Sequence, residues 1–154
     1  AEFEKFEINS TNKNYPFSNK KFDIIFSKSF IEHLMNPMKF FDWSYEILNE
    51  NGKLINLTPD WESNYKIFFD DVTHVKPFSK ITLFQSLEMA NFKHIEVFRF
   101  KQLPSTWNSK FINTLASITA FFAPRRPKNK WLRWSRELML VGVGKKVTKS
   151  EHSV

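Results

Sequence analysis

The feature that most constrains the fold is a short, almost uninterrupted run of apolar β-forming residues, Phe22–Phe26 (FDIIF). A strand that is apolar on both of its faces is typical of a parallel sheet covered by helices on each side. The run therefore predicts a central strand in the middle of such a sheet. Polar residues, Ser27–Ser29, follow it directly, at the end where open α/β sheets bind their ligands.

Helical and strand patterns alternate along the rest of the chain. Asn36 and Pro37 form a helix start, apolar residues recur at helical spacing up to Leu48, and Asn51 with Gly52 supplies a left-handed stop. The predicted strands are 3–8, 22–26, 53–57, 94–100 and 138–143. The predicted helices are 37–50 and a second one that Ser79 caps. The second helix should face inward with Leu83, Phe84, Leu87 and Ala90 and should end at Asn91 in the left-handed conformation. This alternation predicts an α/β sheet with helices on its faces.

The length of 154 residues favours one domain, 1–154, with a helical basic insert at about 104–136. The chain starts with Ala1 and enters a predicted strand at once, so we expect the natural protein to begin further upstream. No cysteine is present, which excludes disulfides and thiolate metal sites. We expect a cytoplasmic protein, because no apolar run approaches the roughly 20 residues that span a bilayer.

The net charge of +7 is concentrated toward the C-terminus, since 99–149 holds twelve Lys or Arg and the single acidic residue Glu137. Within 107–136, Phe111, Leu115, Ile118 and Phe122 fall on one helical face, and basic residues surround two tryptophans. This segment is interpreted as a lid over a substrate, as a contact with an anionic membrane surface, or as a helix packed on the sheet. Nucleic acid is a weaker alternative because no RNA-binding signature is present.

Four pieces of the sequence, in order, resemble class I S-adenosylmethionine-dependent methyltransferases of the small-molecule type. The first is Phe22–Leu34 with Asn36-Pro37, which resembles the fourth strand of that family and the loop after it. The others are Tyr15-Pro16-Phe17, Gly52-Lys53-Leu54 with Thr58-Pro59, and His74–Ser79 with Ala90-Asn91-Phe92. The resemblance covers about 4–100 and resumes at 137–146.

The resemblance implies a partial Rossmann-like sheet, mostly parallel with an antiparallel last strand and with helices on both faces. It also implies S-adenosylmethionine as cofactor and methyl transfer to a small-molecule or lipid-like acceptor. The family's glycine-rich cofactor loop is missing, because the only glycines are Gly52, Gly142 and Gly144 and none has that context. We therefore expect the chain alone to bind the cofactor weakly and to be inactive. The alternatives are a non-catalytic partner-binding protein of the same fold and a nucleic-acid modifier.

Site residues follow from the resemblance and from the ends of the predicted strands. His33 and His74 are candidates for accepting a proton from the methyl acceptor, with structural roles in their loops as the alternative. The other candidates are Glu7, Ile8, Asn9, Ser27, Lys28 and Ser29 for the cofactor, and Glu32, Asp60, Trp61 and Tyr65 for the substrate. In ubiquinone-pathway O-methyltransferases a Glu-x-x-Glu-His stretch is linked to a divalent metal. This chain has Ser29 in place of the first carboxylate, so no metal site is expected.

Overall fold

The computed structural model describes residues 16–124 and 127–147. The predicted strand 3–8 therefore lies outside the described residues. The elements in order are β1 (Phe22–Lys28), the 3-10 turn η1 (Ile31–His33), α1 (Pro37–Ile47), β2 (Leu48–Pro59), α2 (Trp61–Asn64), η2 (Phe68–Asp70), α3 (Lys80–Met89), β3 (Lys93–Phe100), η3 (Pro104–Thr106), α4 (Lys110–Phe122), α5 (Lys130–Arg136) and β4 (Met139–Lys145).

The four described strands form one open sheet in the order β1-β2-β4-β3. β1 and β2 are parallel, with Ile25 opposite Leu54, and β4 is antiparallel to both of its neighbours. β1, β2 and β3 consequently run in one direction and β4 runs against them. The predicted antiparallel last strand is confirmed, and the chain inserts it between β2 and β3.

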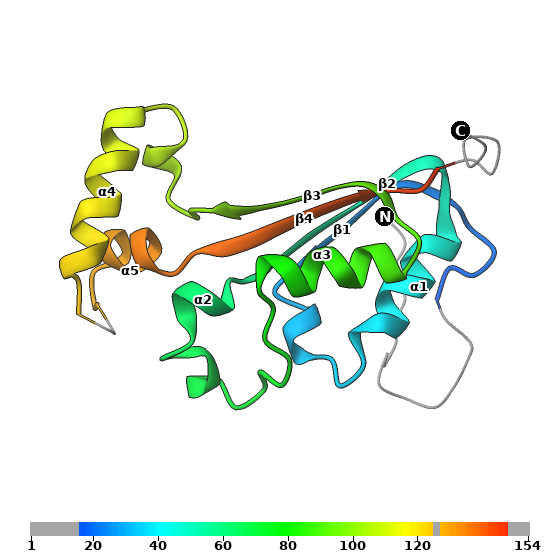
Figure 1. The fold of residues 1–154 in the computed structure, drawn as a ribbon, viewed down its shortest axis with the longest axis horizontal. Coiled ribbons are helices and arrows are strands. Elements are labelled where there is room, and N and C mark those ends of the chain that lie inside the picture. Colours follow the sequence, from blue (N-terminus) through cyan, green and yellow to red (C-terminus); the bar gives the residue numbers. More distant parts are fainter. Residues whose placement is uncertain (1–15, 125–126, 148–154) are drawn as a thin grey trace.

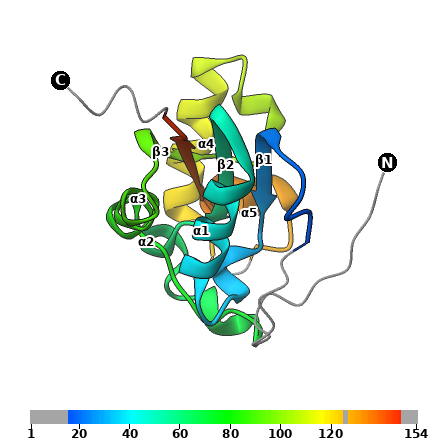
Figure 2. The same cartoon turned by 90° about the vertical axis from the view of Figure 1, so that its right-hand side faces the viewer.

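The core lies between the sheet and the helices α1 and α3, which cover the same face (Figures 1 and 2). Phe41 of α1, Leu54 of β2 and Leu83 of α3 are all fully buried there. Gly144 allows the turn between α3 and β3 to approach β4 closely, because a Cβ at this position would lie 2.8 Å from Cβ of Phe92. Burial of these large side chains supplies most of the free energy that fixes the sheet against the two helices.

The predicted central position of Phe22–Phe26 is wrong for the described sheet, because β1 lies at its edge. On the face that α1 and α3 leave open, Ile24 and Phe26 are 60% and 62% exposed. The composition of Phe22–Phe26 indicated that both faces of the strand suit an apolar environment. The composition could not indicate which strands flank this one, because strand pairing depends on residues far away in the sequence.

Three details of the predicted helices also differ. The helix from Pro37 ends at Ile47 rather than Glu50, because Leu48 is extended, with ψ of 142°, and pairs with Phe22 of β1 as the chain enters β2. Asn51 is left-handed, with φ of 65°, but it lies within β2. Phe84, predicted to face inward, is exposed.

The helical insert lies between β3 and β4 in the sequence and projects beyond the sheet at the end away from α1 (Figure 1). The apolar residues predicted to share a face of this helix are exposed on α4, most of all Phe111 and Phe122. Among the described residues, no helix has the length and apolar content needed to cross a bilayer.

Candidate active site

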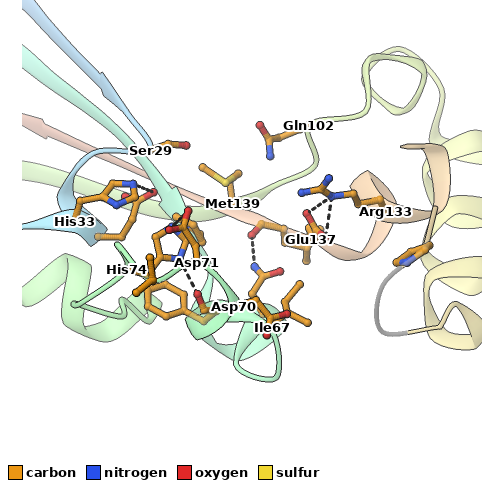
Figure 3. Close-up of a pocket in the computed structure, with 17 residues that line it drawn as sticks. Ser29, His33, Ile67, Asp70, Asp71, His74, Gln102, Arg133, Glu137 and Met139 are labelled. Carbon is orange, nitrogen blue, oxygen red and sulfur yellow. Dashed lines mark hydrogen bonds and ion pairs between the residues drawn. The ribbon is translucent and has the colours of Figure 1, made fainter. Parts of the chain in front are cut away.

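A cavity of about 950 Å³ lies at the carboxyl ends of β1 and β2, beside the start of β4 (Figure 3). Four parts of the chain form its walls: the loop after β1, the segment from the end of β2 to His74, the loop after β3, and the α5 region. The polar and charged side chains that line it are Ser29, Glu32, His33, Asn64, Asp70, Asp71, His74, Gln102, Arg133 and Glu137. The cavity thus brings together residues from segments that are far apart in the sequence.

Ser29 reaches the cavity because the chain turns sharply where β1 ends. Its backbone is left-handed, with φ of 50°, and its N–H still donates to the carbonyl of Leu57 at 2.9 Å. Ile31, fully buried two residues later, anchors η1 in the core. The turn therefore directs residues 29–33 across the ligand-binding end of the sheet.

Glu32 is the most buried charged residue in the cavity wall, with no exposed surface. Its Oε2 accepts a hydrogen bond of 2.9 Å from the hydroxyl of Thr58, which is equally buried. Its Oε1 has no hydrogen-bond partner among the described residues. Its backbone carbonyl accepts from the N–H groups of Val75 and Lys76. Glu32 therefore ties the loop after β1 to the loop that carries His74.

His33 and His74 lie side by side, with ring centroids 4.8 Å apart. Nδ1 of His74 is 2.8 Å from the carbonyl oxygen of Phe68, and Nδ1 of His33 is 3.2 Å from that of Thr73. A carbonyl can only accept, so we assign the hydrogen of each neutral ring to Nδ1. Nε2 of each ring is then the atom with the free electron pair.

Asp71 adds a carboxylate beside these histidines. Its Oδ1 accepts from the backbone N–H and the hydroxyl of Thr73, and its Oδ2 lies 3.7 Å from Nε2 of His74. The hydrogen bonds from Thr73, helped by the nearby histidines, hold the pKa of Asp71 below its ordinary value. Asp71, Asp70 and Glu32 give this wall an acidic character in a chain whose net charge is +7.

The opposite wall comes from the helical insert. Arg133 of α5 contributes to it, paired with Glu137 at 2.9 Å (Figure 3). Sequence reasoning did not single out Asp71, Arg133 or Glu137 as site residues. The spacing of Arg133 and Glu137 gave a weak signal, since it is that of an ion pair on a helix, but such pairs are common on surfaces.

Asp60, Trp61 and Tyr65 do not line this cavity. Asp60 is fully buried and its Oδ2 accepts from Nε of Arg99 at 2.7 Å and from the hydroxyl of Ser63. Burial alone would lower the pKa of Arg99, but its hydrogen bond to Asp60 and the charges of Asp60 and Glu62 raise it. The Trp61 ring packs edge-on against Phe68 and Tyr65, and Tyr65 is half exposed.

The predicted cofactor residues are spread over different environments. Ser29 lines the cavity, Lys28 is exposed, and Ser27 is buried with no hydrogen-bond partner for its hydroxyl among the described residues. The structure places Ser27 opposite Asn56 of β2. Residues Glu7, Ile8 and Asn9 lie outside the described residues.

The glycines do not form a cofactor cradle. A Cβ added at Gly142 would meet Leu83, one at Gly144 would meet Phe92, and one at Gly52 would meet the backbone of residues 22 and 49. All three glycines therefore serve packing within the protein. Among the described residues, no glycine is left open for the close approach of a ligand.

The chain resembles known proteins in its sequence and in its fold. The family model described as "Methyltransferase domain" matches residues 3–56, about a third of the chain. The solved structures that resemble the chain include many methyltransferases. The fold is that of the class I methyltransferases. These findings confirm the resemblance seen in the sequence and support S-adenosylmethionine as the cofactor.

Three similar structures indicate the extent of the likeness. A Bacillus halodurans C-125 protein assigned as a methyltransferase has 17% identity and a TM-score of 0.57, over 94% of this chain and 71% of that one. A Haloferax volcanii methyltransferase in complex with its activator has 13% identity and a TM-score of 0.64, over 93% and 60%. Haemonchus contortus phosphoethanolamine N-methyltransferase 2, in complex with S-adenosyl-L-methionine, has 14% identity and a TM-score of 0.54, over 82% and 34%. The chain thus spans only part of each relative, and no curated protein matches it.

Proposed function

We propose that this chain forms the methyl-acceptor side of the active site of an S-adenosylmethionine-dependent methyltransferase that acts on a small-molecule or lipid-like acceptor. The observation that carries the proposal is the cavity at the carboxyl ends of β1 and β2, with Glu32, His33 and His74 in its wall. Ligands of open α/β sheets bind at this end of the strands. The methyltransferase fold makes methyl transfer the chemistry that best suits the position.

The residues of this wall would act by position and by holding a proton. Bound S-adenosylmethionine supplies an electrophilic methyl group on a positively charged sulfur. The carboxylates of Glu32, Asp70 and Asp71 favour a cation nearby. Nε2 of His33 or His74 can accept the proton that an acceptor hydroxyl or amine loses as it is methylated. Alignment of acceptor and methyl group supplies most of the remaining rate enhancement.

A titration followed by NMR tests where the cofactor binds. We expect S-adenosylmethionine to shift the backbone amide signals of residues 29–33 and 71–74, with weak affinity because the glycine loop is missing. Exposed His94 on β3 serves as a reference signal that should not move. If the shifts were confined to α4, or no signal moved at millimolar cofactor, the cavity would not be the site.

Transfer of a labelled methyl group to phenolic, amine and quinol acceptors tests the reaction itself. We expect the chain alone to be inactive, so the assay is run with an added polypeptide that carries the glycine-rich cofactor loop of the methyltransferase family. His33→Gln and His74→Gln should then reduce transfer by about 10²–10⁴-fold if either ring accepts the proton. Cofactor binding with no transfer to any acceptor would instead favour the non-catalytic partner-binding protein.

We further propose that the protein is cytoplasmic and meets an anionic membrane surface through α4. Phe111 and Phe121 are 77% and 84% exposed, and α4 contains no acidic residue. Exposed aromatic side chains beside lysine and arginine suit the interface of anionic lipids. The same helix would bring a lipid-like acceptor close to the cavity, because α4 packs against α5, which carries Arg133.

Vesicle flotation tests this contact. The chain should float with phosphatidylglycerol-containing vesicles, and Phe121→Ser should reduce the bound fraction several-fold. Ile81→Ser removes an apolar residue that is 66% exposed on α3 and should have no effect. Equal binding of both variants would contradict a role for α4. RNA binding tests the nucleic-acid alternative: retention of the chain on RNA that disappears at moderate salt would show that charge attraction alone holds it.

A further inference from the structure

Three possible metal ligands gather at one point of the cavity wall: Glu32, His33 and His74. Oε1 of Glu32 has no hydrogen-bond partner among the described residues, and His33 Nε2 lies 3.9 Å from it. The metal-ligating atoms that these three residues offer all lie within 4.8 Å of one another. We propose that Glu32, His33 and His74 bind a divalent transition-metal ion, with Zn²⁺ as the best match.

The opposite end of each side chain is already fixed by a hydrogen bond. Nδ1 of His74 donates to the carbonyl of Phe68, and Nδ1 of His33 donates to Thr73. Histidines that ligate metals are typically oriented in this way, with the second ring nitrogen donating to a backbone carbonyl or a carboxylate. Oε2 of Glu32 is held by the Thr58 hydroxyl. All three ligating atoms are therefore oriented before any ion arrives.

The carboxylate provides a second, independent indication. Glu32 has no exposed surface, yet its Oε1 has no hydrogen-bond partner among the described residues. A buried carboxylate oxygen without a partner is costly unless a cation or a donor meets it. The two side chains that face this oxygen, His33 and His74, are 31% and 15% exposed, so the site opens toward the cavity on one side.

The chemistry of the donors selects the class of metal. Two imidazoles and one carboxylate are a known Zn²⁺ set that leaves a fourth position open, and Co²⁺ or Fe²⁺ accept the same ligands. Mg²⁺ prefers oxygen ligands alone. Oδ2 of Asp71, 3.7 Å from Nε2 of His74, can supply the fourth ligand. Ligands about 2.1 Å from a tetrahedral ion are roughly 3.4 Å apart, so ligand atoms that lie up to 4.8 Å apart must close by up to about 1.4 Å.

The sequence argued against a metal because Ser29 stands where related enzymes have a carboxylate. It could not show that His74, from the loop after β2, comes to lie beside His33. A bound metal ion would occupy the ring nitrogens that the proposed function uses to accept a proton, so that proton-accepting role belongs to the metal-free protein. Metal binding itself can be measured without a cofactor or an acceptor.

Cobalt binding tests the proposal directly. The chain, freed of metals by a chelator, is titrated with Co²⁺, and its visible absorption is followed; Zn²⁺ is then added as competitor. We expect one equivalent of Co²⁺ to give the intense bands of a tetrahedral site, and Zn²⁺ to abolish them. His74→Gln and Glu32→Gln should each weaken binding by at least tenfold, whereas His94→Gln on β3 should not change it.

Circular dichroism of each variant separates lost binding from lost folding, and His74→Gln is less prone to misfold than Glu32→Gln because the Glu32 side chain is fully buried. The proposal is overturned if the folded chain gives no saturable spectrum, or if His74→Gln and His94→Gln bind Co²⁺ equally. Preference for Mg²⁺ over Zn²⁺ would overturn the assigned metal class. Failure of cofactor binding with an intact cobalt spectrum would instead count against the proposed methyltransferase site alone.

Discussion

The buried hydrogen bond from Thr58 to Glu32 sets how firmly the cavity wall is held. The oxygens are 2.9 Å apart and both residues are fully buried. Thr58→Val keeps the shape of the side chain but removes the donor. A hydrogen bond to a charged group contributes about 1.5–3 kcal/mol, and the added methyl group returns about 0.8 kcal/mol. We expect the free energy of unfolding to fall by about 1–2 kcal/mol.

Urea denaturation followed by circular dichroism measures this change in the free energy of unfolding. In thermal denaturation the Tm should fall by about 2–8 °C. Repeating Thr58→Val in a Glu32→Leu background isolates the pair, because the coupling free energy should then account for most of the loss. The hydroxyl-retaining Thr58→Ser should keep that coupling. If Thr58→Val cost the same with and without the carboxylate, the hydrogen bond would not be what stabilises the wall.

Two further perturbations probe the sheet and the acidic wall. Gly144→Ala should lower the free energy of unfolding by about 1–3 kcal/mol, because the new Cβ would lie 2.8 Å from Cβ of Phe92. Gly142→Ala meets leucine side chains that can move, so denaturation should show a smaller loss; equal losses would refute the steric reasoning. Thr73→Val should raise the pKa of Asp71 toward its ordinary value of 3.8, as carboxyl NMR titration can show. Because folding lowers the pKa of Asp71, the stability that its ionised carboxylate contributes is present above pH 3.8 and is lost as the pH falls further. An unchanged pKa of Asp71 in Thr73→Val would contradict the role of Thr73.

Local signals in the sequence predicted local structure well. Ser79 caps α3 as expected, in a reciprocal pair with Thr82, and Asn91 takes the left-handed conformation that ends the segment, with φ of 67°. Such features depend on residues a few positions apart. The end of α1 was predicted three residues too late, because pairing of Leu48 with Phe22 on β1 overrides the helical pattern.

The part of the cavity wall that follows β1 was predictable from the sequence. Ser29, Glu32 and His33 follow a strand whose end marks a ligand site in this kind of sheet, and the resemblance placed His74 near them. Arg133 could not be found in this way, because only the packed position of α5 brings it to the cavity. The burial of Asp60, against Arg99 of β3, was likewise invisible in the sequence.

The edge position of β1 has a practical consequence for anyone who purifies this polypeptide. Its outer backbone N–H and carbonyl groups have no neighbouring strand among the described residues, and Ile24 and Phe26 next to them are exposed. An exposed apolar edge strand can accept an extended segment from the same chain or from another molecule. If another copy of the chain adds to it, concentrated solutions self-associate, and Phe26→Lys should then keep the chain monomeric at concentrations where the unsubstituted chain forms oligomers.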